Sequence, residues 1–322
     1  MSTPLRFIPD EAKRFKNRSG ESIAVVEITI RTMMGIYLLK PTSRNKSLIL
    51  GVVGRAQDRL DFELYGYAYL SNHGSLLVGV RDAVQLARIM EFIHSNIARE
   101  LGRKEHSDWS GRFWGRRGRP ILILTNEDLV ARLRYLLANS TKEGLVTRPS
   151  RWPGAHCAKA LCEGRADVGV WVDRTELRRL RFNSKPKERA TESDASTSYR
   201  VRLDKLPCWA ELTDEQYRRA VVGLCKDIAE QAALTRRGDG DQVVGVKRLL
   251  RFSPHHRPGG IEKSPAPPVH CRDRKLRCWF LEAYRSFVEA YRWAYRRLGL
   301  LGGEDDFPPG GVAPAALLAA AD

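Results

Sequence analysis

Tyr65-Gly-Tyr-Ala-Tyr-Leu-Ser-Asn-His-Gly-Ser-Leu-Leu-Val78 is the stretch on which the fold of this chain depends. Aromatic and apolar residues lead into a polar corner, Ser71 to Ser75, and a second apolar run leaves it. Because strand-forming residues flank residues that favour tight turns, the pattern predicts two strands that meet at a turn. The turn places His73 at the end of a strand, where a side chain is held firmly and is still open to solvent and to a metal ion.

Strand and helix patterns alternate on both sides of this predicted hairpin. Alternating apolar residues predict strands, and apolar residues at helical spacing predict helices, in the ranges 22–30, 41–60, 62–70, 76–80, 82–103, 120–124 and 127–138. We expect Asn126 to cap the last of these helices. The order strand-helix-strand-strand-helix-strand, followed by a helix, is that of a ferredoxin-like split βαβ domain. The predicted fold class is therefore α+β, with an antiparallel, RRM-like sheet and helices.

The rest of the chain divides into a linker and a helical region. Residues 182–198 are rich in Lys, Glu, Ser and Thr and have almost nothing to bury, which is typical of a flexible segment. Further helices are expected after the capping box Thr213-Asp-Glu-Gln216, at 242–252 and at about 274–300. The predicted organisation is a domain at 1–165 that begins with a basic arm, a partly disordered linker at 166–200, and a helical extension at 201–322 with a loose tail.

The charge of the chain indicates an acidic partner. The formal net charge is +17 and the pI is near 9.9, and nucleic acid and anionic membrane are the usual partners of such a surface. No segment has the apolar length needed to cross a bilayer, and the N-terminus has no signal-peptide pattern. We therefore expect a cytoplasmic, nucleoid-associated protein with no membrane partner, whose six cysteines are thiols rather than disulfides.

A basic and aromatic segment precedes the last predicted strand. Aromatic rings offer stacking faces to unpaired bases, and arginines neutralise phosphates. The other interpretation is a glycine-rich connector whose tryptophans cover the core, and the sequence leaves both open. With two arginines from the basic side of the preceding helix, this segment supplies the predicted DNA contacts: Arg99, Arg103, Arg112, Trp114, Arg116, Arg117 and Arg119.

The helix predicted at 127–138 carries a tyrosine that the core does not need. Its apolar residues fall on one face, and Tyr135 lies nearly opposite them at about 100° per residue. Asn139, four residues later, projects beside Tyr135. Spacing alone therefore makes Tyr135 stand out as a candidate functional residue.

The stretch from Tyr69 to Val78 resembles the signature of the single-tyrosine HUH transposases, in the branch of the REP-associated tyrosine transposases. The typical sequence in that family is Asn-His, one hydrophobic residue, His and then Leu-Leu. This chain has Asn72-His73 but then Gly74 and Ser75, so the second histidine position holds a serine. This is the main departure from the family.

Further motifs of the same family follow in the correct order. They include Tyr135 and Asn139 at the family's spacing, Gly144-Leu-Val146, and Trp152-Pro153, while Ser140 replaces a usual proline. The resemblance covers about the first half of the chain. The helical second half is similar to extensions found in some relatives and carries no motif that specifies a function.

The resemblance implies an activity and a set of site residues. In the family, a divalent cation polarises a phosphate of single-stranded DNA, and a tyrosine attacks it to give a 5′-phosphotyrosine and a free 3′-hydroxyl. Carried over to this chain, Tyr135 is the nucleophile and the ligands of Mg²⁺ or Mn²⁺ are His73, Asn139 and, as a degenerate position, Ser75. The expected partner is single-stranded or hairpin DNA, and the family leaves monomer and homodimer both open.

Two functions remain open at this point. The first is a transposase or single-stranded-DNA endonuclease that works at hairpin repeats. The second is a non-cleaving, DNA-binding descendant, because the hydroxyl of Ser75 is a poor replacement for an imidazole. Zinc is a third, minor interpretation: two clusters combine histidine with cysteine, at 156–162 and 270–278, but neither has Cys-x-x-Cys spacing, so ordinary thiols are expected.

Overall fold

The computed structural model of the protein describes residues 6–103, 109–183, 189–239, 242–257, 267–301 and 307–313. Its centre is an antiparallel sheet in the order β3-β4-β2-β5, with β8 added in parallel beside β5 and β1 paired with the start of β2. The strands of this sheet are β1 (Phe15–Lys16), β2 (Ser22–Arg31), β3 (Glu63–Tyr69), β4 (His73–Val80), β5 (Arg119–Ile123) and β8 (Val269–His270). This strand order, together with the chain order β2-α1-β3-β4-α2-β5, is the predicted split βαβ arrangement, and the α+β prediction is confirmed.

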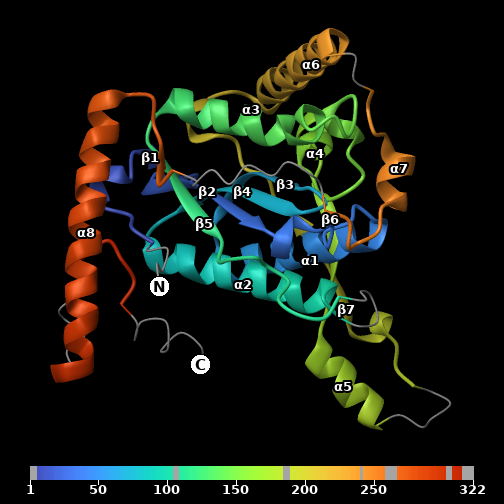
Figure 1. Ribbon diagram of the computed structural model, residues 1–322, viewed down its shortest axis with the longest axis horizontal. Coiled ribbons are helices and arrows are strands. Elements are labelled where there is room, and N and C mark those ends of the chain that lie inside the picture. Colours follow the sequence, from blue (N-terminus) through green and yellow to red (C-terminus); the bar gives the residue numbers. More distant parts are fainter. Residues whose placement is uncertain are drawn as a thin grey trace.

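Helices cover both faces of the sheet. Helices α1 (Ser43–Leu60) and α2 (Ala83–Leu101) pack together on one face, and α3 (Asn126–Lys142) covers the other (Figure 1). The N-cap side chains of α1 and α2 accept backbone N–H groups, Thr42 from Asn45 and Asp82 from Gln85. The apolar stripe predicted on α2 is buried: Leu86, Met90, Ile93, Ile97 and Leu101.

The β3–β4 hairpin forms at the predicted corner, but β4 begins at His73, three residues earlier than expected. Tyr69 is opposite Gly74 across the hairpin. A Cβ on Gly74 would lie 2.4 Å from the ring of Tyr69, so the ring occupies the volume that a side chain at position 74 would need. This contact gives a physical reason for the glycine that follows His73.

Helix α3 is capped by Thr125 and not by Asn126, which corrects the prediction. The Thr125 hydroxyl accepts the N–H of Asp128 at 3.2 Å and donates to its carboxylate at 2.7 Å. Asn126 is already the first residue of the helix. Threonine and asparagine are both good N-caps, so the sequence leaves this boundary uncertain by one residue.

The segment 166–200 is folded where the structure describes it, and the prediction of a linker there is wrong. Strands β6 (Asp167–Val172) and β7 (Ser196–Val201) form an antiparallel pair that packs on α1, and α5 (Arg174–Asn183) lies between them. A Cβ on Gly51 of α1 would lie 2.1 Å from the Val170 carbonyl oxygen. Glycine at position 51 thus lets helix and strand touch directly, a contact that local composition does not reveal.

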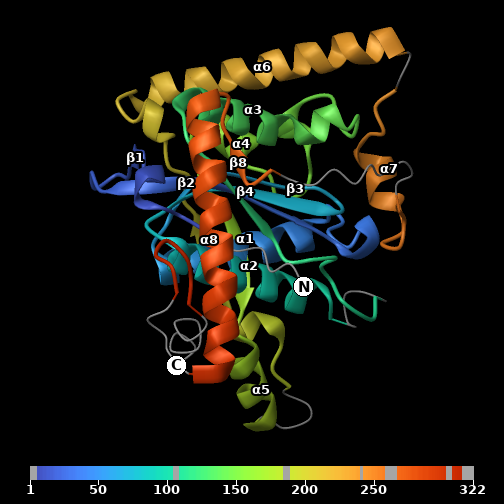
Figure 2. The same ribbon diagram turned by 60° about the vertical axis from the view of Figure 1, so that its left-hand side comes forward.

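The C-terminal region is helical, as predicted. It contains α6 (Asp214–Asp239), α7 (Val246–Arg251) and α8 (Arg274–Leu301), preceded by the short α4 (Ala158–Glu163). Helix α6 lies across α3 and α4, and α8 runs along the β5 and β1 side of the sheet (Figures 1 and 2). Thr213 and Gln216 form the predicted capping box. No helix in the described part of the chain is long and apolar enough to span a membrane.

Phe7, Ile8 and residues 307–313 pack on or beside α8, which corrects the prediction of a loose tail for residues 307–313 and shows that this part of the predicted N-terminal arm is packed. The ring of Phe7 stacks on Phe287 of α8 with centroids 4.4 Å apart. The N–H of Ile8 donates to the carbonyl of Gly310 at 2.8 Å, and the Tyr291 hydroxyl donates to the carbonyl of Val312. The other parts of the predicted tail, 302–306 and 314–322, and of the linker, 184–188, lie outside the described residues.

Candidate functional site

His73 and Ser75 project toward the sheet face that α3 covers. In β4 they alternate with Gly74, and Ser75 is opposite Thr29 of β2 and Ala68 of β3. Gly66, two residues before Ala68 and on the same face, lies against α3: a Cβ there would be 3.3 Å from Leu133 and 3.5 Å from Leu136. Alternation along the strands therefore assigns both predicted ligand positions to the α3 face.

The imidazole of His73 is neutral and offers one free lone pair. Burial, with a smaller contribution from the cation of Arg31, lowers the pKa of His73 to about 4. Its Nδ1 lies 2.8 Å from the side-chain oxygen of Asn72, which can only accept, so Nδ1 carries the proton. Nε2 is then the unprotonated nitrogen, which is the form of histidine that binds a metal or accepts a proton.

Ser75 lies deeper than His73, with 3 % of its surface exposed. Its cross-strand neighbours Thr29 and Ala68 are also small, so a row of short side chains runs across the sheet beneath α3. A serine hydroxyl is a neutral and short donor. It is a weaker metal ligand than an imidazole would be in the same row.

Helix α3 brings Asn139 toward the same end of the sheet as His73. The helix starts just after β5, whose last residue pairs with Val25, and it runs back along the sheet. Glu143, just after its last turn, lies close enough to Arg31 to raise the pKa of that guanidinium. Arg31 is in register with His73. Asn139 is buried one turn before Glu143, with 5 % exposure.

Tyr135 is on the outer side of α3, as the helical spacing predicts, and is 40 % exposed. The guanidinium of Arg132 lies over its ring at 4.0 Å from the centroid, and the ammonium of Lys142 at 5.3 Å. The hydroxyl is thus carried on a ring that two cations flank. Such cations attract phosphate as well as steadying the ring.

A buried carboxylate holds Arg132 in place, and sequence reasoning missed it. Glu27 of β2 is 1 % exposed and accepts from Arg132 Nε at 2.7 Å and Nη2 at 2.9 Å. Nε2 of His270, on β8, lies 3.1 Å from the same carboxylate. Burial opposes ionisation, but the hydrogen bonds from His270 and Arg132 hold the pKa of Glu27 below its ordinary value. The signal was present, because Glu27 is the one charged residue within the mainly apolar run from Ile23 to Ile30.

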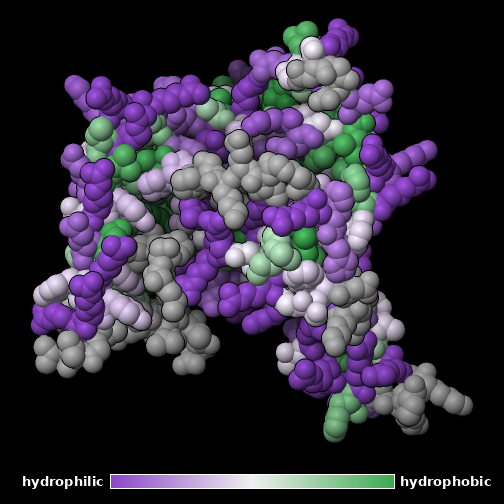
Figure 3. Space-filling model, viewed as in Figure 1, coloured by the Kyte–Doolittle hydropathy of each residue, from purple (hydrophilic) through white to green (hydrophobic). Residues whose placement is uncertain are grey.

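Positive charge gathers around the His73 end of the sheet. Arg116 and Arg257 lie close enough to Arg31 to contribute to the lowering of its pKa, to which burial contributes most and which Glu143 opposes. The face in Figure 3 is covered mainly by hydrophilic side chains, with apolar ones in small separate areas. A concentration of arginines beside a neutral histidine suits a polyanion better than it suits a free cation.

The predicted DNA contacts fall into two groups. Arg112, Arg116 and Arg117 are exposed on the segment before β5, and Arg119 is half-buried at the start of that strand. Arg99 and Arg103 lie on or just after α2, in the layer on the other face of the sheet from α3, and Arg103 pairs with Glu100 at 3.5 Å. Within the first group, Arg116 lies close enough to Arg31 to affect its pKa, whereas Arg117 acts on Arg6 and Arg119 on Tyr284 of α8. The second group does not share the α3 face.

Trp114 packs against the fold, in line with the interpretation in which the tryptophans of this segment cover the core. Its indole N–H donates to the carbonyl of His94 at 2.8 Å, and its ring meets the rings of His94 and Phe113 edge-on. It also forms an isolated bridge with Thr32. The tryptophan thereby ties the basic segment to α2 and to the end of β2.

The residues at the predicted metal position form a weak donor set. Imidazole, amide and hydroxyl are acceptable to Mg²⁺ or Mn²⁺, but carboxylates usually supply the charge that holds these ions. Within the described residues no group of three or more His, Cys, Asp or Glu side chains is arranged to hold a metal. With Arg31 next to His73, these residues do not fit a complete divalent-cation site.

The histidines of the two histidine–cysteine clusters make contacts within the fold. Nδ1 of His156 accepts the N–H of Ala158 at 3.1 Å, and its Nε2 side faces the carbonyls of Leu136 and Leu137 without a well-formed hydrogen bond. His156 is also bridged to Ala68, in the same cross-strand row as Ser75. His156 therefore packs the segment before α4 against α3. In the second cluster, His270 binds Glu27.

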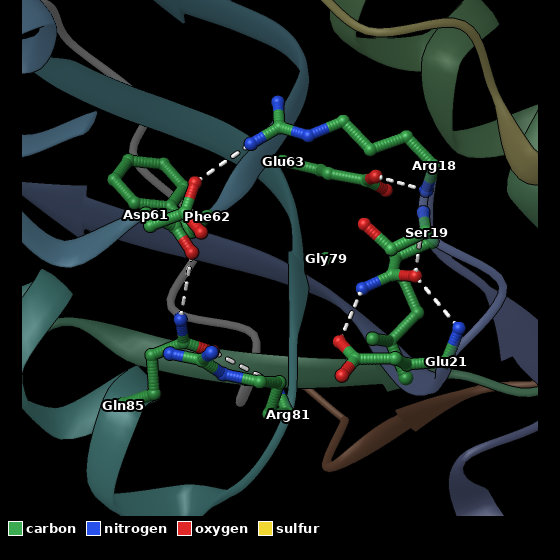
Figure 4. Close-up of a pocket in the computed structure, with 11 residues that line it drawn as sticks. Arg18, Ser19, Glu21, Asp61, Phe62, Glu63, Gly79, Arg81 and Gln85 are labelled. Carbon is green, nitrogen blue, oxygen red and sulfur yellow. Dashed lines mark hydrogen bonds and ion pairs between the residues drawn. The ribbon is translucent and has the colours of Figure 1, made fainter. Parts of the chain in front are cut away.

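A small polar pocket lies at the opposite end of the sheet from His73. Figure 4 shows the guanidinium of Arg18 on Asp61 and the backbone N–H of Arg18 on the carboxylate of Glu63, at 2.6 Å each. Gln85 accepts the N–H of Arg81 at 2.8 Å. The polar groups shown here are engaged with one another, and we assign this pocket no ligand.

Comparison with known proteins gives two weak structural likenesses. No protein-family model and no curated protein sequence matches the chain. A REP-associated tyrosine transposase bound to a REP hairpin aligns with a TM-score of 0.37 and 16 % identity, over 51 % of this chain and 87 % of that one. A protein from Deinococcus radiodurans R1, described provisionally as a transposase, aligns with a TM-score of 0.29 and 14 % identity, over 38 % of this chain and 95 % of that one. At these values the assignment of function rests on the residues of the site.

Proposed function

We propose that this chain is a DNA-processing protein of the transposase type that binds single-stranded hairpin DNA at the His73 end of the α3 face. The observation that carries the proposal is the convergence of functional groups there. A neutral histidine on β4 and a buried amide on α3 lie toward the same end of one sheet face, and α3 also carries the candidate nucleophile Tyr135 on its outer side. Arginines border that end.

In the cleaving form of the proposal, Tyr135 is the nucleophile. Its hydroxyl oxygen attacks a DNA phosphorus atom, the bond to the 3′ oxygen breaks, and the products are a 5′-phosphotyrosine and a free 3′-hydroxyl. The residues here support parts of this step: Arg132 and Lys142 flank the ring of Tyr135, and the arginines near His73 attract phosphate. In this form His73, Asn139 and Ser75 are the proposed positions for a divalent cation, although by themselves they make an incomplete donor set.

The second candidate is a protein that binds the same DNA and does not cleave it. The weak donor set favours this form, because one imidazole with a neutral amide and a buried hydroxyl supplies no negative charge. Binding through arginines and aromatic rings needs no metal. Both forms share the same DNA surface and differ only in the covalent step.

One experiment separates the two forms. Labelled single-stranded hairpin DNA is incubated with wild type, Tyr135→Phe and Ser75→His, with Mn²⁺ or Mg²⁺ and with chelator, and covalent adducts are resolved on denaturing gels. The cleaving form predicts a wild-type adduct that is lost in Tyr135→Phe and with chelator. The non-cleaving form predicts binding without an adduct, and an adduct gained by Ser75→His means that only the metal site is deficient. Absence of hairpin binding by wild type refutes the proposed function in both forms.

A further inference from the structure

Met34 combines two features that packing does not explain. It is 53 % exposed, and its backbone is in the left-handed region, with φ 52° and ψ 9°. The other non-glycine residue with positive φ among the described residues, Asp61, ends helix α1, where such a conformation is common. A large apolar side chain in a strained and exposed position marks a residue held there for a reason other than burial.

The backbone around Met34 is fixed on both sides. The N–H of Met33 donates to the carbonyl of Phe113 at 2.8 Å, and the N–H of Gly35 donates to Thr32 at 3.1 Å. The hydroxyl of Thr32 donates to the carbonyl of Ile36 at 2.6 Å. These bonds explain how the strain is sustained, and they leave the Met34 side chain pointing out from a rigid support.

The Met34 loop is joined directly to the candidate site. The N–H of Thr32 donates to the carbonyl of Asn72 at 2.9 Å, and the side chain of Asn72 accepts from His73. Two other segments enclose the loop: Gly115 donates its N–H to Arg31 at 2.9 Å, and Tyr37 donates its N–H to His256 at 3.2 Å. Each of these segments continues into an exposed arginine, Arg116 and Arg257 respectively.

We propose that Met34 is a wedge that stacks against an unpaired base of hairpin DNA whose phosphates lie on Arg31, Arg116 and Arg257. Unbranched, polarisable methionine is one of the side chains that proteins place between or against bases. The rigid loop holds the methionine side chain in place, and the surrounding arginines attract the DNA phosphates. The inference rests on the proposed function, since it assumes that hairpin DNA is the ligand.

Glycine at position 34 gives a clean test, because glycine adopts positive φ without strain. Met34→Gly therefore removes the side chain and relieves the backbone strain, which offsets the greater conformational entropy of glycine in the unfolded chain. We expect its affinity for a fluorescein-labelled hairpin with a single-stranded tail to fall about tenfold, the lower end of the loss for one base stacked on an aromatic side chain. The slope of log affinity against log salt stays unchanged, because no ion pair is lost.

Matched variants and a fluorescent base complete the design. Met34→Leu keeps an apolar side chain and is expected to bind like wild type. Phe182→Ala removes a larger apolar group, 89 % exposed on α5, and is expected to change nothing. A 2-aminopurine scanned along the tail changes its fluorescence at one position with wild type and loses that change with Met34→Gly.

The outcomes separate the wedge from the DNA-binding function beneath it. If wild type binds the hairpin and Met34→Gly binds equally well, the wedge is refuted and the proposed function stands. If Met34→Gly and Phe182→Ala weaken binding to the same extent, the effect is not specific to the loop and the wedge is again refuted. If wild type binds no hairpin, both inferences fail together.

Discussion

Glu27 is the residue through which the sheet and the candidate nucleophile are connected. A carboxylate in the middle of an apolar strand destabilises the fold unless both of its oxygens are hydrogen-bonded. Here Arg132 and His270 provide those hydrogen bonds. Arg132 in turn lies over the ring of Tyr135. The position of the tyrosine thus depends on a buried ion pair and not only on the helix that carries it.

Glu27→Gln is expected to lower the free energy of unfolding by about 3 kcal/mol, because it leaves the half-buried guanidinium of Arg132 without its counter-charge. Urea denaturation at pH 7 measures the change. The matched control is Glu215→Gln, which removes an exposed pair with Arg219 and is expected to cost at most about 1 kcal/mol. Equal losses in the two variants would mean that the Glu27 pair contributes no more than a surface pair.

The same pair has a defined dependence on pH. The pKa of Glu27 is lowered in the folded protein, so its contribution is fully present above the unfolded value of 4.5 and is lost as pH falls through the folded value. The difference between wild type and Glu27→Gln is therefore expected to shrink in acid below pH 4.5.

The exposure of a residue was predicted correctly where it depends on local spacing, whereas contacts with distant partners were not predicted. Tyr135 was placed on the outer side of its helix by periodicity, and that exposure is confirmed. Gly74 was recognised as unusual, but its cause, the ring of Tyr69 across the hairpin, appears only in three dimensions. Glu27, Arg132 and His270 come from widely separated parts of the chain, so no sequence window contains the network. The catalytic role of Tyr135 and the metal role of His73 stay predictions.

At the scale of elements, helices and strands of the α+β sheet were predictable because each has its own periodic pattern. Strand β7 was missed because its segment is polar. Strand β6 is apolar, but its partner β7 begins more than 20 residues later, and the pair depends on α1 and on the close approach at Gly51. Strand β8 was missed because two residues carry no period, and it forms by adding to β5. Local pattern predicts an element when the element buries a stripe of its own, and fails when a neighbour supplies the stability.

Two substitutions at the start of α3 test which residue caps the helix. Thr125→Ala is expected to lower the free energy of unfolding by about 1 kcal/mol, because it removes the hydroxyl that accepts the N–H of Asp128. Asn126→Ala is expected to cost no more than a few tenths of a kcal/mol, since alanine is a better helix former than asparagine at that position. Thermal unfolding of the two variants side by side measures the difference. The reverse order of stabilities would restore Asn126 as the cap.

At the scale of the whole molecule, contacts between remote segments decide the architecture. The N-terminal segment, α8 and residues 307–313 meet through Phe7, Phe287 and Gly310, although the sequence suggests an arm and a loose tail. Such packing depends on pairs of residues nearly 300 positions apart, and the local sequence around either residue does not predict it. The extension from 201 onward is therefore helical as expected but is not a separate attachment, because α6 lies directly on α3 and α4.

The docking of α6 can be tested with the cysteines that the chain already has. Cys162 of α4 and Cys225 of α6 bring their sulfurs within 3.7 Å, and the hydrogen bond with Cys225 lowers the pKa of Cys162 although burial opposes this. The Cys162 thiolate is therefore expected to attack oxidised glutathione, and Cys225 then displaces the bound glutathione as a thiol. The products are one protein disulfide and two molecules of reduced glutathione. The protein loses two hydrogen atoms in mass, and thiol titration finds two fewer free cysteines.

Closing this link should stabilise the folded chain. The two cysteines are 63 positions apart, and a loop of that length is expected to raise the free energy of unfolding by up to about 4 kcal/mol, seen as a higher Tm that dithiothreitol reverses. Cys225→Ser abolishes both the mass change and the stabilisation, whereas Cys278→Ser, which removes an exposed thiol on α8, leaves them intact. A wild-type protein that keeps all six thiols under these conditions would contradict the close approach of α6 to α4 at these two sulfur atoms.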